Sequence, residues 1–227
     1  MTSFGNAVAP LAAALFLAAA APPPAPAPAP SNAPAAHDES DPAALRLWYK
    51  QGRCLVDQEG RLAEKILATA PDSDDYLFAW LKAEKQARCF DDPVMAPAKL
   101  HSNAMRGAVA EALLLRDFSA VGVRRGKRIT AVFAESAVPD GRVDVRWRAF
   151  LKLAECAVRL EPARSFAVFS TPVASPEEKA AVRALVPALG DCLPPGVDLP
   201  MRPSMLRSFL AEAAYRVSVA PPAAGRP

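Results

Sequence analysis

Two arginines at matching places in the two halves of the chain are the residues best suited to bind an anionic partner. Arg106 and Arg207 each stand near the start of a predicted helix, and each is followed five residues later by a glutamate. A cation at that place opposes the helix dipole, which favours anions at the N-terminus. A cation repeated at an unfavourable position predicts a specific anionic partner, either a carboxylate of the chain or a bound ligand.

The chain offers these arginines carboxylates on several predicted helices. The candidates are Asp75, Glu177, Glu111 and Glu212. Residues five apart lie on different faces of a helix, so neither arginine is expected to pair with the glutamate of its own helix. We favour a structural ion pair that holds the fourth predicted helix of each half against the third, over a ligand site. Such a pair predicts that Arg207→Ala lowers the melting temperature.

A basic group between the two halves is a further binding candidate. It consists of Arg124, Arg125, Lys127 and Arg128. Such a cluster could meet anionic lipid, cell-wall polymer or nucleic acid. No aromatic residues interleave with it to stack on bases, so we do not expect nucleic acid as a partner. A solvated connector is the simpler interpretation.

Catalytic and metal-binding patterns are sparse in this sequence. There are only two histidines, His37 in a Pro-rich leader and His101 in a predicted loop, and no Gly-x-Ser-x-Gly accompanies them. Phosphate loops, His-Glu-x-x-His and EF-hand spacing are absent. The acidic residues near helix ends are expected to be caps rather than calcium ligands. We therefore predict no catalytic residue, no metal and no cofactor.

The two halves of the chain share an ordered series of residues, which predicts a tandem duplication. The spacing between matched residues is about 102 positions. The matches include Arg46 with Arg148, Trp48 with Phe150, Cys54 with Cys156, Glu59 with Glu161, Ser73 with Ser175, Cys89 with Cys192, Arg106 with Arg207 and Glu111 with Glu212. Small changes of spacing between these matches are expected in loops, where insertions are tolerated.

The four cysteines are expected to form disulfides, because the start of the chain resembles an export signal. Three connectivities exist, and the duplication selects Cys54–Cys89 and Cys156–Cys192, which give each repeat its own bridge. Closing a loop of about 35 residues would stabilise each half by roughly 3–4 kcal/mol. A zinc site is the alternative, but the sequence has no Cys-x-x-Cys pair.

The first residues indicate export to the periplasm or the medium. An apolar run ends in small residues that allow cleavage after Ala20, although no Lys or Arg precedes the run. The run is shorter than the roughly 20 residues that span a bilayer. The formal net charge of +3 is too small to imply a polyanionic partner.

Apolar periodicity and capping signals predict an all-α protein of two four-helix repeats. Expected helices cover about residues 42–56 and 59–69 in the first repeat, and 144–158 and 161–170 in the second. Third helices begin after Ser73 and after Ser175, where Ser-Pro-Glu-Glu predicts a capping box with Glu178. Asn103 and Ser204 are the expected caps of the fourth helices.

The expected segments divide the chain into six parts. They are a signal peptide at residues 1–20, an Ala/Pro-rich disordered linker at 21–41, repeat 1 at 42–118, a connector at 119–143, repeat 2 at 144–219 and a disordered tail at 220–227. The connector is compatible with a β-hairpin, a helix or a loop.

The second repeat carries the most distinctive motifs. They are Ser175-Pro176-Glu177-Glu178, Gly190-Asp191-Cys192-Leu193-Pro194 and Leu206-Arg207 followed by Leu210-Ala211-Glu212-Ala213. In these motifs the chain resembles a group of uncharacterised exported bacterial proteins with cysteine-bracketed helices. The resemblance is looser in the first repeat, where Glu84 to Arg88 replaces Pro187 to Asp191. It implies no activity.

We therefore expect an exported, non-catalytic binding or structural module. A binding module should have an apolar or basic groove between the repeats. The alternative is an envelope-associated hydrolase or an inhibitor of one, and an enzyme should have a pocket with converging polar groups, near His101. A third interpretation is an assembly factor with an exposed apolar patch on a fourth helix.

Overall fold

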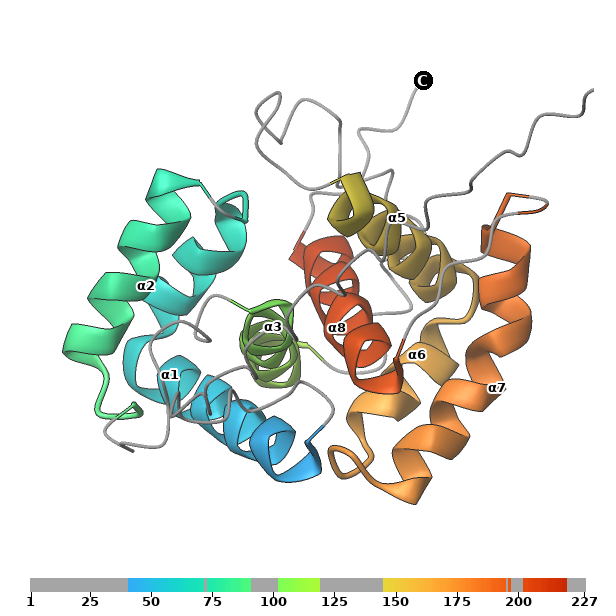
Figure 1. Cartoon of the computed structure of the whole chain (residues 1–227), viewed down its shortest axis with the longest axis horizontal. Helices are drawn as coiled ribbons and strands as arrows, with labels where there is room; N and C mark the ends of the chain where they lie inside the picture. Colours follow the sequence, from blue (N-terminus) through green and yellow to red (C-terminus); the bar gives the residue numbers. More distant parts are fainter. Residues whose placement is uncertain are drawn as a thin grey trace, which may run out of the picture. The chain divides into compact units, whose positions relative to one another are not determined.

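The computed structural model describes residues 41–71, 73–90, 102–118, 145–194, 196 and 202–219. Within these residues it has seven α-helices and no strand, which confirms the predicted all-α class. The helices are α1 (Pro42–Ala68), α2 (Asp74–Gln86), α3 (Asn103–Asp117), α5 (Val145–Leu160), α6 (Pro162–Phe169), α7 (Pro176–Cys192) and α8 (Pro203–Val219) (Figure 1). The predicted signal peptide, connector and tail, nearly all of the linker, and His101 lie outside the described residues.

The first predicted pair of helices is present, and a kink at Glu59 joins the two into one continuous element, α1. α1 runs through Glu59, whose φ of −135° and ψ of 50° are not helical. Glu161 has nearly the same angles, φ −128° and ψ 63°, but there the chain divides into α5 and α6. The difference follows from the next residue. Pro162 has no N–H to continue the hydrogen-bond ladder, whereas Gly60 keeps one.

Most of the predicted helix starts are confirmed. Asp41 caps α1, with Pro42 in its first turn, and the Oγ of Ser73 and of Ser175 accept N–H bonds at the starts of α2 and α7. For α3 the prediction is wrong by one residue, because Ser102 and not Asn103 is the cap. The serine hydroxyl reaches the Met105 N–H three residues ahead, which is the usual geometry of an N-cap.

The capping box at the start of α7 forms only in part. Ser175 Oγ accepts from the Glu178 N–H at 3.1 Å, as expected. The Glu178 carboxylate, however, accepts from the Ala174 N–H at 2.7 Å rather than from the N–H of Ser175. Ala174 has a positive φ of 55°, so the backbone of the turn before α7 differs from that of an ordinary capping box.

Both predicted disulfides are present. Cys54–Cys89 joins α1 to the segment after α2, and Cys156–Cys192 joins α5 to the end of α7. Their Cα–Cα distances, 5.8 and 5.9 Å, are within the usual range for a disulfide. Each predicted repeat is therefore closed by a bridge over nearly the same length of chain, 35 and 36 residues.

α3 and α8 are the helices in which the largest share of residues is buried. α3 packs against α1 and α8, and α8 packs in addition against α5 (Figure 1). A single hydrophobic cluster includes residues of all seven described helices, with Trp48, Trp80 and Met105 fully buried. The two predicted repeats therefore share one core instead of forming separate ones.

Gly107 allows α3 and α8 to approach each other. A Cβ added at Gly107 would overlap both the Cβ and the backbone Cα of Ser208. In the register that matches Arg106 with Arg207, Gly107 corresponds to Ser208. The two helices thus touch at equivalent positions, and one member of the pair has no side chain.

Gly107→Ala should therefore destabilise the protein, although alanine is the better helix former. The added methyl group meets backbone, which cannot rotate away, so we expect a loss of about 1–3 kcal/mol in the free energy of unfolding. Gly190→Ala in α7 is the matched control, since a Cβ there meets nothing within 4 Å. Urea titration of both variants measures the effect, and an unchanged Gly107→Ala midpoint would refute this close approach.

Gln51 is a buried polar residue with unpaired groups. It is 3 % exposed, and in the described part of the chain neither Nε2 nor Oε1 has a hydrogen-bond partner. In the register that matches Cys54 with Cys156, the second repeat has Leu153 at this position, and that leucine is buried. Burying an amide without hydrogen bonds destabilises the folded state.

Gln51→Leu is accordingly expected to stabilise the protein by about 1–2 kcal/mol, because it removes two unpaired polar groups and adds apolar contact. A higher urea midpoint would show this. Gln86→Leu on the exposed side of α2 provides the control and should leave the midpoint unchanged. Loss of stability in Gln51→Leu would mean that the amide has a role that the described contacts do not include.

Candidate functional site

Arg106 is completely buried between α3, α8 and the end of α1. Its Nε and Nη2 donate to the carboxylate of Glu212 in α8 at 2.7–3.0 Å. Nη1 and Nη2 also donate to the carbonyls of Ile66 and Leu67, at 2.7 and 3.1 Å. These carbonyls belong to the last turn of α1, where no helical partner is available. Arg216 adds a second cation, 2.7 Å from Glu212.

Arg207 occupies the equivalent place on α8 and makes the reciprocal pair. Its Nε and Nη2 each donate to the carboxylate of Glu111 in α3 at 2.7 Å. Nη1 donates to Glu178 Oε2 in α7 at 3.0 Å. Both Nη atoms also lie 3.2 Å from the carbonyl of Thr171, just after α6. The two arginines thus exchange glutamates across the contact of α3 with α8.

An aromatic ring lies against each guanidinium. Tyr76 is 5.2 Å from Arg106, and Tyr49 is 5.1 Å from Arg207, measured from the guanidinium carbon to the ring centroid. Tyr49 shares a hydrogen bond of 3.2 Å with the hydroxyl of Ser208. Burial, reinforced by the charge of Glu111, raises the pKa of Tyr49 above its ordinary value, so this phenol stays protonated. The rings complete a water-poor environment around both ion pairs.

The two ion-pair groups carry opposite net charges. The first group, Arg106, Arg216 and Glu212, has two cations and one anion, whereas the second, Arg207, Glu111 and Glu178, has one cation and two anions. Burial favours a raised pKa for Glu212, but Arg106 and Arg216 outweigh it and hold that pKa below the ordinary value. Burial is the main cause that raises the pKa of Glu111, and the charge of Glu178 adds to it, so the lowering effects of Arg207 and Arg53 do not outweigh them.

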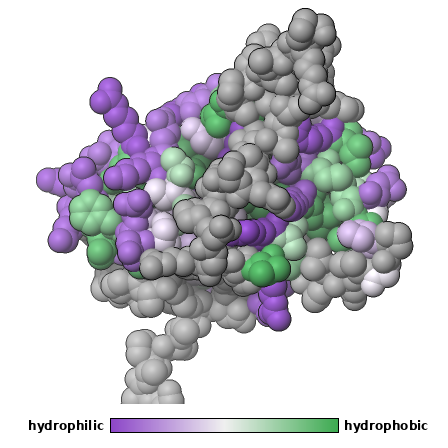
Figure 2. All heavy atoms as spheres, turned by 90° about the horizontal axis from the view of Figure 1, so that it is seen from above, coloured by the Kyte–Doolittle hydropathy of each residue, from purple (hydrophilic) through white to green (hydrophobic). Residues whose placement is uncertain are grey.

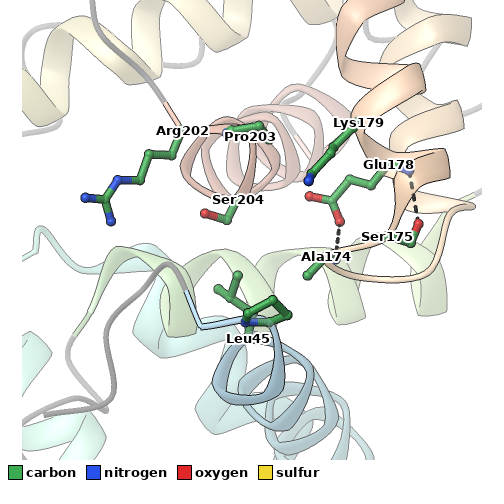
Figure 3. Close-up of a pocket in the computed structure, with 9 residues that line it drawn as sticks. Leu45, Ala174, Ser175, Glu178, Lys179, Arg202, Pro203 and Ser204 are labelled. Atoms are coloured by element: carbon green, nitrogen blue, oxygen red, sulfur yellow. Dashed lines mark hydrogen bonds between the residues drawn. The ribbon is translucent and has the colours of Figure 1, made fainter. Parts of the chain in front are cut away.

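A pocket opens beside the second group. It has a volume of about 210 Å³ and lies where the start of α1 meets the starts of α7 and α8. Its lining consists of Pro42, Leu45, Ala174, Ser175, Glu178, Lys179, Arg202, Pro203 and Ser204. Figure 3 shows the Glu178 carboxylate and the Lys179 amine extending into the space between α8 and Leu45 of α1. Glu178 therefore belongs both to the ion-pair group and to the pocket.

The predicted site residues are distributed unevenly over the structure. Arg106 and Arg207 come together with Glu212 and Glu111, which were among the candidate carboxylates, whereas Asp75 and Glu177 are not their partners. The basic group at residues 124–128 and His101 lie outside the described residues. Among the residues described, no three metal-ligating side chains gather in one place. Glu178 was not predicted as an arginine partner, because its capping-box position gave it a sufficient local role.

The molecular surface mixes polar and apolar side chains. Figure 2 shows hydrophobic residues in separate groups among hydrophilic ones on the face it presents. Three of the exposed large hydrophobic residues, Leu77, Phe78 and Leu81, share α2, whereas most of α3 and α8 is buried. None of the described helices combines the length and the hydropathy that a membrane-spanning segment requires.

Comparison with known proteins gave no matching family model, no matching curated protein and no matching solved structure. We therefore infer the function from the geometry of the chain itself.

Proposed function

We propose that this chain is an exported, non-catalytic binding or structural module, built from two tandem four-helix repeats behind a signal peptide. It would act in the periplasm or outside the cell. The alternative is an envelope-associated hydrolase or an inhibitor of one.

Several pairs of equivalent residues support the duplication. Glu59 and Glu161 have nearly the same backbone angles, and each half has its own disulfide. Gly107 and Ser208 lie in contact, and the two arginines exchange their glutamates. Such reciprocity is the arrangement of a two-fold symmetric pair of subunits, in which residue i contacts residue j and j contacts i.

The disulfides also support export. Both cysteine pairs are at bonding distance, and no described cysteine is free. Structural disulfides form and persist in oxidising compartments and are rare in the cytosol of mesophiles. Together with the small-residue cleavage site after Ala20, this favours a mature chain that begins at Ala21.

The observation that carries the binding proposal is the pocket at the junction of the two predicted repeats. α1 of the first repeat forms one wall, and α7 and α8 of the second form the others. The Glu178 carboxylate is held in one orientation by Ala174 and Arg207, at 2.7 and 3.0 Å. A pocket with a rigid polar group between apolar walls is the usual form of a small-molecule site.

Native mass spectrometry of the chain purified from its own envelope tests this proposal. We expect a mass that begins at Ala21, lacks the four cysteine hydrogens, and carries an added non-covalent mass that denaturation removes. A chain that keeps Met1 and free thiols in the cytoplasm would contradict export, and a chain without any retained mass would contradict binding. Release of fragments from isolated envelope polymer would favour the hydrolase instead.

A further inference from the structure

We infer that the pocket between α1, α7 and α8 binds a small zwitterion of the amino-acid type, with its ammonium group at Glu178 and its carboxylate group at Lys179. This inference rests on the proposed binding function and names the ligand class for that same pocket.

Glu178 supplies the site for the ammonium group. The residue is only 2 % exposed, yet it lines the pocket. Oε2 accepts both hydrogen bonds that described residues make to this carboxylate, from the N–H of Ala174 and from Nη1 of Arg207. Oε1 accepts none from the described residues. A carboxylate oxygen has two lone pairs, so a donor that enters the pocket meets an oriented acceptor.

The charges behind Glu178 favour a cationic group there. Among the described residues, Arg207 is the only cation in an ion pair with Glu111 or Glu178, and Arg53 acts on Glu111 only as a weaker influence. These three paired residues therefore carry one excess negative charge. The equivalent group around Glu212 has two arginines and no such excess. A buried charge without a partner is unfavourable, and an ammonium group bound at Oε1 would balance it.

Lys179 supplies the cation for the carboxylate group. It follows Glu178 on α7, it is exposed, and its amine extends over the same space (Figure 3). It is in none of the ion pairs found between described residues. A free amino acid has one carbon between its ammonium and carboxylate groups, so neighbouring residues of opposite charge can bind both. A ligand with only one of the two charges would meet one of these residues as a like charge.

The walls and the size limit the rest of the ligand. Pro42, Leu45, Ala174 and Pro203 offer apolar surface. The volume of about 210 Å³ is smaller than the roughly 300–1,000 Å³ of common ligand pockets. A single amino acid with a small or medium apolar side chain fits these conditions better than a peptide.

Ligand-observed NMR of the mature, oxidised chain with the twenty standard amino acids tests the inference. Calorimetry then compares the best binder with two analogues, the amine that lacks its carboxylate group and the acid that lacks its amino group. We expect both analogues to bind about tenfold more weakly or worse, since each loses a charge-assisted hydrogen bond. An analogue that binds as tightly as the amino acid would overturn the inference.

Lys179→Ala should weaken binding of the amino acid by about tenfold and strengthen binding of the amine analogue, which no longer meets a like charge. Arg183→Ala, one turn further along α7 and outside the pocket lining, is the matched control and should change neither. Because Lys179 is exposed, its variant should keep the melting temperature of the parent. If no amino acid binds while native mass spectrometry finds a retained ligand, the ligand class is wrong and the proposed binding function stands.

Discussion

Glu212→Gln should cost far more stability than Glu111→Gln, although the two glutamates occupy equivalent places. Without the Glu212 carboxylate, the fully buried Arg106 loses the anion that accepts hydrogen bonds from its Nε and Nη2, and Arg216 loses its ion pair with the same glutamate. Removing one partner of a buried ion pair costs about 3–5 kcal/mol, because the remaining charge is uncompensated. Glu212 is in ion pairs with two arginines, so we expect the upper part of that range.

Glu111→Gln has a milder consequence, because Arg207 keeps Glu178 at 3.0 Å. The variant also removes a carboxylate whose pKa burial raises, which marks its charged form as disfavoured. The expected loss is about 1–2 kcal/mol, the usual value for an altered hydrogen bond. Urea unfolding at pH 7 with intact disulfides compares the two variants. Equal losses of stability would contradict the difference in charge between the two ion-pair groups.

The same pair of variants should respond differently to acid. The pKa of Glu212 is held below its ordinary value, so its contribution is present above the ordinary pKa and is lost as the pH falls through the lowered one. In strong acid the parent chain should therefore be no more stable to unfolding than Glu212→Gln. The pKa of Glu111 is raised, so the contribution of this residue to the free energy of unfolding is present at low pH and decreases as the pH rises.

Arg207→Ala should be the more damaging of the two arginine substitutions at neutral pH. It leaves Glu111 and Glu178 buried with no cation bonded to either among the described residues, and a loss of about 3–5 kcal/mol is expected. Arg106→Ala leaves the Glu212–Arg216 pair intact, and Arg216 still donates to the carbonyl of Leu67 at 2.6 Å. Its loss should be smaller by about 1 kcal/mol or more.

The pH dependence of Arg207→Ala separates this explanation from a loss of packing. Two uncompensated carboxylates would have raised pKa values, so the folded state would bind protons and gain stability as the pH falls from 7 towards 5. The melting temperature of Arg207→Ala should therefore rise relative to that of Arg106→Ala over this interval. A difference that does not change with pH would show that lost side-chain contacts, and not charge, cause the effect.

Local chemistry made much of the architecture predictable. Asp41, Ser73 and Ser175 were recognisable as caps because a hydroxyl or carboxylate before a helix satisfies backbone N–H groups that lie two or three residues ahead. The disulfides were predictable because the predicted duplication left one connectivity that treats both halves alike. The α1 kink at Glu59 was placed correctly as a break, but a glycine instead of a proline after it allowed one continuous element.

The partners of the polar residues required the tertiary structure. Asp75, Glu177, Glu111 and Glu212 were equivalent candidates in the sequence, and only the contact of α3 with α8 selects the last two. Glu178 had a sufficient local role as a capping residue, yet its carboxylate turns to Arg207 and towards the pocket. The sequence gives no reason for Gly107 within a helix, and the structure supplies one, since Ser208 of α8 lies against it.

The amino-acid sequence by itself thus predicted most of the helix starts, the pairing of the cysteines and a chain of two similar halves. The fold alone decided that the halves share one core, that each arginine takes its glutamate from the other half, and that a pocket forms between α1, α7 and α8. The physical reason is the range of the interactions. Caps and breaks depend on neighbours within a few residues, whereas ion pairs and cavities depend on helices that are about 100 residues apart in the chain.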